Sequence, residues 1–286
     1  MVSLLGDYFR PGNQDGKIID GFTFYNEADM LELRLRYLYP YVDEFVIVEA
    51  DRKFSGEPKP LLLADLMASP RFAWAADKVT IRSLRIDTSG LDLSTRPETF
   101  DPKADFWKIE AQQRNAIRPD SMGPNDILLM GDLDEIPAVD FLKAIRSSAW
   151  LRFKMNLLPV ACDQLFFYYN YKSLRSEIWQ GTIAMGARAA AVHSNQEWRD
   201  RRKKLSRWRH GGWHFSYFMS AEQIADKIRS FSHQELNTDY MRDTDRIRSA
   251  IQQRKDLFER SDAMVEYDPA GYPEELKGLL IKHFPC

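Results

Sequence analysis

Two aspartates, Asp132 and Asp134, directly follow the apolar run 127–130 in the order Gly-Asp-Leu-Asp-Glu. Residues two apart in an extended segment point to the same side, so this pair can present two carboxylates to one ion. Hard oxygen donors select Mg²⁺ or Mn²⁺. The spacing therefore favours a divalent cation site. The alternative is that Asp134 caps a helix beginning at Pro137 while Asp132 is only solvated.

A βαβ unit is predicted upstream of this pair. Residues 18–25 alternate bulky apolar with other residues and predict a strand. Residues 28–38 carry apolar side chains at helical spacing, and Asn26 is available as the N-cap. The short apolar run 45–48 is typical of a strand that helices cover on both faces. Strand, helix and strand in this order indicate a parallel sheet.

The same patterns predict further elements along the chain. Residues 87–104 are rich in Ser, Thr, Pro and Asp and predict a loop, while Pro137 suits the first turn of a helix over 138–146. Strands are expected at 79–84, 127–130, 164–171 and 178–185, and helices at 105–117, 220–231, 243–258 and 273–282.

The charge balance excludes a global basic field. Forty Lys and Arg stand against 42 Asp and Glu, which gives a net charge of -2, so no nucleic-acid partner is expected. Residues 199–209 form a basic block. Such a block is usually a solvated mobile loop. Its functional alternatives are a lid over a diphosphate, a grip on an anionic acceptor, or an RNA-binding patch.

Cysteine content and hydropathy indicate the compartment. Cys162 and Cys286 are too few for a disulfide framework or a thiolate zinc site. The apolar stretch from Val2 to Leu5 is too short for a signal peptide, and no run approaches the roughly 20 apolar residues of a membrane span. These features predict a cytoplasmic protein without a transmembrane segment.

Eight short motifs follow one another along the chain. They are Asp20-Gly21-Phe22, Asn26-Glu27, Glu32-x-Arg34-Leu35, Phe45-Val46-Ile47-Val48-Glu49, Phe54-Ser55-Gly56, Pro58-Lys59-Pro60-Leu61, Gly131-Asp132-x-Asp134-Glu135-Ile136-Pro137 and Gly212-Trp213-His214-x-Ser216. Together these motifs resemble family 17 glycosyltransferases. The resemblance extends from about residue 18 to the C-terminus and is weakest over 62–104 and 186–210.

The resemblance implies an α/β fold of the GT-A type, which is Rossmann-like and binds a nucleotide sugar on a mixed, mainly parallel central sheet. We expect one domain over 1–286, with a nucleotide-binding half at about 18–150 and an acceptor half at about 151–286. The resemblance also implies a UDP-sugar donor and Mn²⁺ or Mg²⁺. The ion would bridge the two phosphates and neutralise the departing diphosphate.

The reaction implied is an inverting transfer of N-acetylglucosamine, in β1,4 linkage, from UDP-N-acetylglucosamine to an oligosaccharide or glycan acceptor. One alternative keeps the fold but uses another UDP-hexose on a surface glycan. A second alternative is a non-catalytic carbohydrate-binding or nucleic-acid-binding protein that uses the basic block. The intact aspartate pair and the balanced charge argue against this second alternative.

Five nucleotide-site residues follow from the resemblance. Asn26 follows the first strand, and Glu49 ends the second, where similar enzymes place an acid against uracil or ribose. Arg114 and Asn115 lie on the helix before the acidic strand, close to the expected nucleotide, and Lys59 is expected to face a phosphate. The alternatives are a solvated carboxylate for Glu49, an ordinary ion pair for Arg114 and a surface position for Lys59.

Two histidines complete the expected diphosphate site. His214 resembles the C-terminal histidine that joins the two aspartates around the metal, and a neutral imidazole can bind Mn²⁺. A buried structural histidine is the alternative. His233 fits the family pattern too, although a histidine that touches a carbonyl at a helix end would look identical.

An inverting transfer needs a carboxylate that takes the proton of the acceptor hydroxyl. Glu177 is the candidate, because Glu-Ile-Trp-Gln-Gly resembles a Glu-x-x-x-Gly segment of the family. Trp179 and Trp213 are candidates for stacking on sugar rings, with core packing as the alternative. Three other carboxylates stay open for the role of the base: Asp163, Glu197 and Glu222.

Overall fold

Alternating apolar residues explain why the first half of the chain builds a sheet that is covered on both faces. In β2, Phe45 and Ile47 pack into one hydrophobic cluster while Val46 and Val48 pack into another. The computed structural model describes residues 16–260 and 264–285. Its parallel strands, in the order β3-β2-β1-β4, are β3 (Val79–Leu84), β2 (Glu44–Ala50), β1 (Ile18–Phe24) and β4 (Ile127–Asp132).

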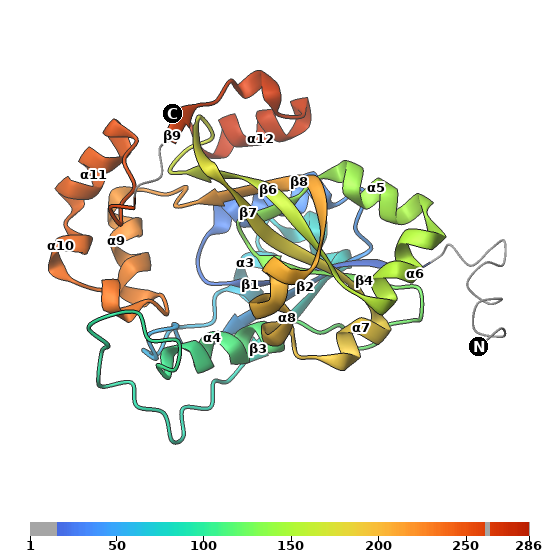
Figure 1. Ribbon diagram of the computed structural model, residues 1–286, viewed down its shortest axis with the longest axis horizontal. Helices are drawn as coiled ribbons and strands as arrows, with labels where there is room; N and C mark the ends of the chain where they lie inside the picture. Colours follow the sequence, from blue (N-terminus) through green and yellow to red (C-terminus); the bar gives the residue numbers. More distant parts are fainter. Residues whose placement is uncertain (1–15, 261–263, 286) are drawn as a thin grey trace.

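The sheet continues into the second half of the chain and has nine strands among the described residues (Figure 1). Four of its pairings are parallel and four are antiparallel, and the antiparallel ones all involve the second half. The predicted mixed α/β sheet is thereby confirmed. Beyond β4 follow β7 (Ser173–Gly186), β6 (Val160–Tyr168), β8 (Ser206–Ser216) and β5 (Glu135–Pro137), with β9 (Met264–Glu266) on β7.

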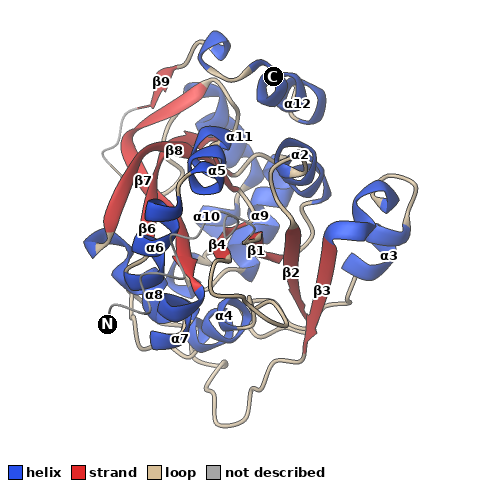
Figure 2. Cartoon of the chain, turned by 90° about the vertical axis from the view of Figure 1, so that its right-hand side faces the viewer, coloured by secondary structure: helices blue, strands red, loops and turns tan. Residues whose placement is uncertain are grey.

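Helices cover both faces of the sheet, and in Figure 2 α12 lies beside α2 while α3 lies beside the edge strand β3. On one face, apolar residues of the sheet pack in one cluster with residues of α2 (Ala28–Leu38), α5 (Val139–Ser147) and α12 (Glu274–His283). The opposite cluster contains residues of α7 (Ala187–Val192) and α8 (Asn195–Arg201), next to α4 (Phe106–Asn115).

A third hydrophobic cluster joins the far part of the sheet to a group of helices at the left of Figure 1. These helices are α9 (Ala221–Ser230), α10 (Asp239–Arg242) and α11 (Thr244–Gln253).

No helix within the described ranges is long and apolar enough to cross a membrane. The remaining elements are α3 (Leu63–Ala68), α6 (Ala149–Leu157) and the 3₁₀ helices η1 (Ala73–Lys78), η2 (Arg202–Lys204), η3 (Gln234–Leu236) and η4 (Pro269–Gly271).

The structure confirms the helix at 28–38 and the strand at 79–84 with the predicted bounds. Three local predictions are wrong. Glu27 occupies the N-cap position of α2 instead of Asn26, without a side-chain capping bond. Pro137 ends strand β5 and does not enter the first turn of a helix. The basic block 199–209 is no loop, because it comprises the end of α8, η2 and the start of β8. Val2 to Leu5 and Cys286 lie outside the described residues.

Arg34 fixes the turn that follows β4. Its side chain is fully buried and donates two hydrogen bonds to the equally buried carboxylate of Asp20, at 2.8 and 2.7 Å. Its Nη1 atom also donates to the backbone oxygens of Asp132, Leu133 and Glu135, at 2.8, 3.0 and 3.0 Å. One guanidinium therefore holds three carbonyls of residues 132–135 in place. We call these four residues the acidic turn.

We predict that Arg34→Met lowers the free energy of unfolding by about 3–5 kcal/mol, because Asp20 would stay buried without a counter-charge. Urea denaturation measures the change. Arg248→Met is the matched control, since Arg248 is half-exposed and its ion pair with Glu222 should contribute less than about 1 kcal/mol. An Arg34→Met cost no larger than that of the control would contradict the role of Arg34.

Candidate functional site

Two adjoining pockets open beside the ends of β1 and β4, where ligands bind in open α/β sheets. The first encloses about 200 Å³ and is lined by Asn26 and Asp134 among others. The second has aromatic walls, with Phe54 as one of its lining residues. Both are lined by Tyr25, Glu27 and Lys227, so these three side chains form the boundary between them.

Asp134 reaches the first pocket and meets two basic side chains. Its Oδ1 lies 3.5 Å from His214 Nε2, and its Oδ2 lies 3.7 Å from Lys227 Nζ. Burial alone would raise the pKa of Asp134, but His214 and Lys227 outweigh burial and hold that pKa below its ordinary value. The carboxylate is therefore ionised at neutral pH and able to bind a cation.

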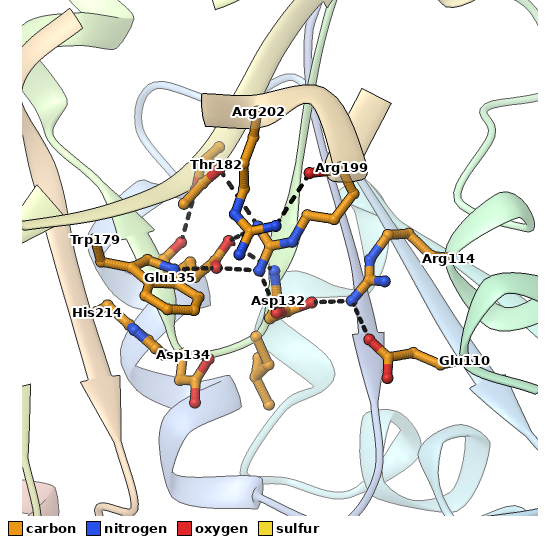
Figure 3. A network of polar contacts seen from close by, with 12 residues as sticks. Glu110, Arg114, Asp132, Asp134, Glu135, Trp179, Thr182, Arg199, Arg202 and His214 are labelled. Carbon is orange, nitrogen blue, oxygen red and sulfur yellow. Dashed lines mark hydrogen bonds and ion pairs between the residues drawn. The ribbon is translucent and has the colours of Figure 1, made fainter. Parts of the chain in front are cut away.

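Asp132 has different partners, although it lies only two residues away. Arg114 donates to one carboxylate oxygen at 3.0 Å and Arg199 donates to the other at 2.6 Å (Figure 3). Burial opposes ionisation of Asp132, yet these two arginines lower its pKa well below the usual range. In this structure Asp132 is the ion-pair partner of two arginines.

Glu135 extends the network towards an aromatic side chain. Its fully buried carboxylate accepts two hydrogen bonds from Arg199, at 2.5 and 3.0 Å, and one from the indole N–H of Trp179, at 2.6 Å. The indole ring packs against the His214 imidazole with a centroid distance of 4.7 Å, and Arg202 lies over the same indole at 5.3 Å. Trp179 thus connects the arginine network to the histidine beside Asp134.

A divalent ion would be held by Asp134 and His214. Their side chains already face each other, and the other ring nitrogen of His214, Nδ1, is buried without a hydrogen-bond partner in the described chain. No group of three His, Cys, Asp or Glu residues in the ranges 16–260 and 264–285 can hold an ion alone. The two residues fit an ion that takes its remaining oxygens from a bound ligand.

The structure brings Glu49 and Lys59 together at the second pocket. Lys59 Nζ donates to Glu49 at 2.8 Å and lines that pocket. The Glu49 carboxylate also accepts the backbone N–H groups of Leu62 and Leu63, both at 2.8 Å, at the start of α3. Both Glu49 oxygens are thus used to anchor the segment 59–63 against the sheet.

Asn115 and His233 have local partners. The Asn115 side chain accepts the backbone N–H of Gln196 at 2.9 Å and joins α4 to α8. His233 Nδ1 lies 2.7 Å from Glu235, and its ring packs edge-on against Trp107. None of these contacts reaches Asp134, so the structure does not place either residue beside the aspartate.

Glu177 is exposed on β7 and lines a shallow depression together with Trp179 and Arg202. Trp213 is buried against Tyr37 and Tyr272, which assigns it to the core. The three alternative bases each have another partner: Asp163 pairs with Arg207, Glu197 closes a capping box with Ser194, and Glu222 pairs with Arg248.

Four side chains at the candidate site were missed from the sequence. Glu27 and Glu135 stand inside the quoted motifs, so those motifs contained a signal for them. Arg199 opens the basic block, which was expected to be solvated. Lys227 gave no signal, because only the packing of α9 brings it to Asp134.

Comparisons with known proteins agree with the motifs. Beta-1,4-mannosyl-glycoprotein 4-beta-N-acetylglucosaminyltransferases of Rattus norvegicus and Homo sapiens are each 28% identical over 138 residues, which is 44% of this chain and 23% and 24% of theirs. The chain thus spans about a quarter of the length of these curated relatives. A crystal structure of an active-site mutant of LgtC has 13% identity and a TM-score of 0.31, with 69% of this chain and 71% of that chain covered.

A family model also matches the chain. The model of glycosyltransferase family 17 matches residues 4–267, which include the second pocket, the first pocket except Phe284, the two aspartates and His214. Because this match extends over most of the chain, the protein belongs to glycosyltransferase family 17.

Proposed function

We propose that the chain transfers N-acetylglucosamine, in β1,4 linkage and with inversion, from UDP-N-acetylglucosamine to a glycan acceptor. The observation that carries this proposal is the meeting of Asp134, His214 and Lys227 at the boundary of two pockets, in a member of a glycosyltransferase family. The activity for which the relatives are named supports the choice of sugar. The competing proposal is a UDP-hexose donor and a surface glycan acceptor.

The second pocket supports a planar base. Its walls include Phe24, Tyr25, Phe54 and Phe231, and aromatic rings give a base a stacking surface. The Gln113 side chain lines the same pocket and offers amide groups for hydrogen bonds to a pyrimidine edge. We therefore assign the uridine to this pocket and the sugar to the first one.

The diphosphate then crosses the boundary between the pockets, next to Asp134. A divalent ion held there by Asp134 and His214 would supply positive charge to the departing diphosphate. Asp132 supports the site indirectly, because it fixes Arg114 and Arg199 behind the acidic turn.

The acceptor is assigned to the side of Trp179. The hydroxyl attacks the anomeric carbon from the face opposite the diphosphate and gives its proton to a carboxylate. Glu177 is exposed and lies two residues from Trp179 on the same strand, so both side chains point to one face of β7. Glu27, which lines both pockets, is the competing base.

A nucleotide-sugar panel tests the donor. We expect released UDP from UDP-N-acetylglucosamine in the presence of Mn²⁺. Calorimetry should show at least about tenfold weaker binding of GDP and CMP than of UDP, since we assign uracil to the second pocket. Faster turnover of a UDP-hexose would favour the competing proposal. Equal affinity for UDP and GDP would mean that the base pocket is assigned wrongly.

The two aspartates are expected to differ on substitution. Asp134→Asn should lower turnover at least about 100-fold and leave stability almost unchanged, because several kcal/mol of charge stabilisation would be lost at a pocket-facing group. Asp132→Asn should lower both turnover and unfolding free energy, since the buried Arg114 and Arg199 would lose a charged partner. Turnover at saturating Mn²⁺ and urea unfolding measure the two effects. Near-normal turnover in both variants would refute the assignment.

Glu177→Gln is expected to lower kcat by about 10²–10⁴-fold with UDP affinity unchanged, as for a lost general base. Steady-state kinetics measure kcat, and calorimetry measures the affinity for UDP. Glu222→Gln is the control, because Glu222 pairs with Arg248 on the surface and should keep full activity. A large kcat loss in Glu27→Gln with normal kcat in Glu177→Gln would transfer the role to Glu27.

A further inference from the structure

Four of the five cationic side chains that line the two pockets have close partners in the protein. Each of these four donates to a carboxylate or carbonyl oxygen at 2.9 Å or less. The pairs are Arg71 with Asp29 and Glu32 at 2.5 and 2.6 Å, Lys59 with Glu49 at 2.8 Å, Lys53 with Glu57 at 2.9 Å, and Arg52 with the Gly56 carbonyl at 2.9 Å. Each of these cations is therefore held close to an acceptor oxygen of the protein.

Lys227 differs from them. Its ammonium lies 3.6 Å from Glu27 Oε1 and 3.7 Å from Asp134 Oδ2, so both carboxylates are beyond the usual hydrogen-bond distance. These contacts are longer than those of the other lining cations, so the ammonium can turn a donor towards an added acceptor.

The packing of α9 holds this charge at the pocket boundary. Ile224 and Ile228 on the same helix are fully buried in the hydrophobic cluster over the far part of the sheet. Lys227 is adjacent to Ile228 in the chain and lines both pockets. Its ammonium also lies 5.5 Å from the centre of the Tyr217 ring, a further contact that favours a cation there.

A diphosphate at this boundary would bring negative charge next to Asp134 and Glu27. Two nearby arginines already have close carboxylate partners, because Arg114 is bound by Glu110 and Asp132, and Arg199 is bound by Asp132 and Glu135. Among the described residues, Lys227 is the cation that lines both pockets and lies beside Asp134 and Glu27.

We propose that Lys227 binds the diphosphate of the donor and stabilises it as the leaving group, an inference that rests on the proposed function. In the transfer, the acceptor oxygen forms a bond to the anomeric carbon while the bond from that carbon to the diphosphate oxygen breaks. The electron pair stays on the diphosphate, and the acceptor proton goes to the general base. Lys227 keeps its proton and donates a hydrogen bond to the oxygen on which charge develops.

The test compares UDP with uridine, because only UDP carries the phosphates. Affinities are measured by calorimetry at one saturating Mn²⁺ concentration for the wild-type chain, Lys227→Met and Lys227→Arg. We expect Lys227→Met to weaken UDP binding about tenfold or more and to leave uridine binding unchanged, since one charge-assisted hydrogen bond is lost. Lys227→Arg should recover most of the UDP affinity and of kcat.

Arg229→Met is the matched control on the same helix, where Arg229 pairs with the exposed Asp226, and it should bind both ligands normally. If Lys227→Met does not fold, Lys227→Gln replaces it in the same comparison. UDP affinity within about twofold of the wild-type value would overturn the inference and leave the proposed function intact. Equal losses for UDP and uridine would also overturn it, as Lys227 would then only shape the pocket.

The proposed function fails in a distinguishable way. In that case the wild-type chain itself would show no preference for UDP over uridine, and the inference about Lys227 would fall with it. A wild-type preference for UDP that Lys227→Met removes and Lys227→Arg restores supports both.

Discussion

The buried pair of Arg34 and Asp20 is the interaction on which the rest of the site depends. A buried ion pair contributes little net stability unless further hydrogen bonds satisfy its remaining groups. Here the remaining donor of Arg34 binds three backbone oxygens of the turn after β4. That arrangement links α2, β1 and the acidic turn, so the carboxylates of the turn project from a fixed backbone into the surrounding cations.

Partners from distant elements then give neighbouring acids different roles. Asp132 is neutralised by arginines from α4 and α8, whereas Asp134 faces His214 of β8 and Lys227 of α9. The first carboxylate is thereby paired with two arginines of the protein, and the second lines the first pocket. In this protein the two carboxylates of the Asp-x-Asp motif have different partners.

Several residues of the family motifs build the scaffold around the site. Glu49 anchors the segment that leads into α3, and Arg34 holds the acidic turn. Gly212 has φ near +139°, and a Cβ atom there would lie 2.0 Å from the Ile136 carbonyl oxygen, so only glycine lets β8 approach β5 this closely. That approach places His214 opposite Glu135 in the sheet.

The sequence by itself determined the elements whose signal is local. The period of apolar residues predicted α2, β3 and the strand ahead of Asp132, because that period depends only on residues close together in the sequence. The motifs indicated family 17, because each motif is a short run of neighbouring residues. Only the tertiary structure decided which charges meet. Arg199 and Lys227 reach the acidic turn through the packing of α8 and α9, and His233 turns to Glu235. Periodicity reports that a face is buried, but the partner across that face depends on contacts distant in sequence.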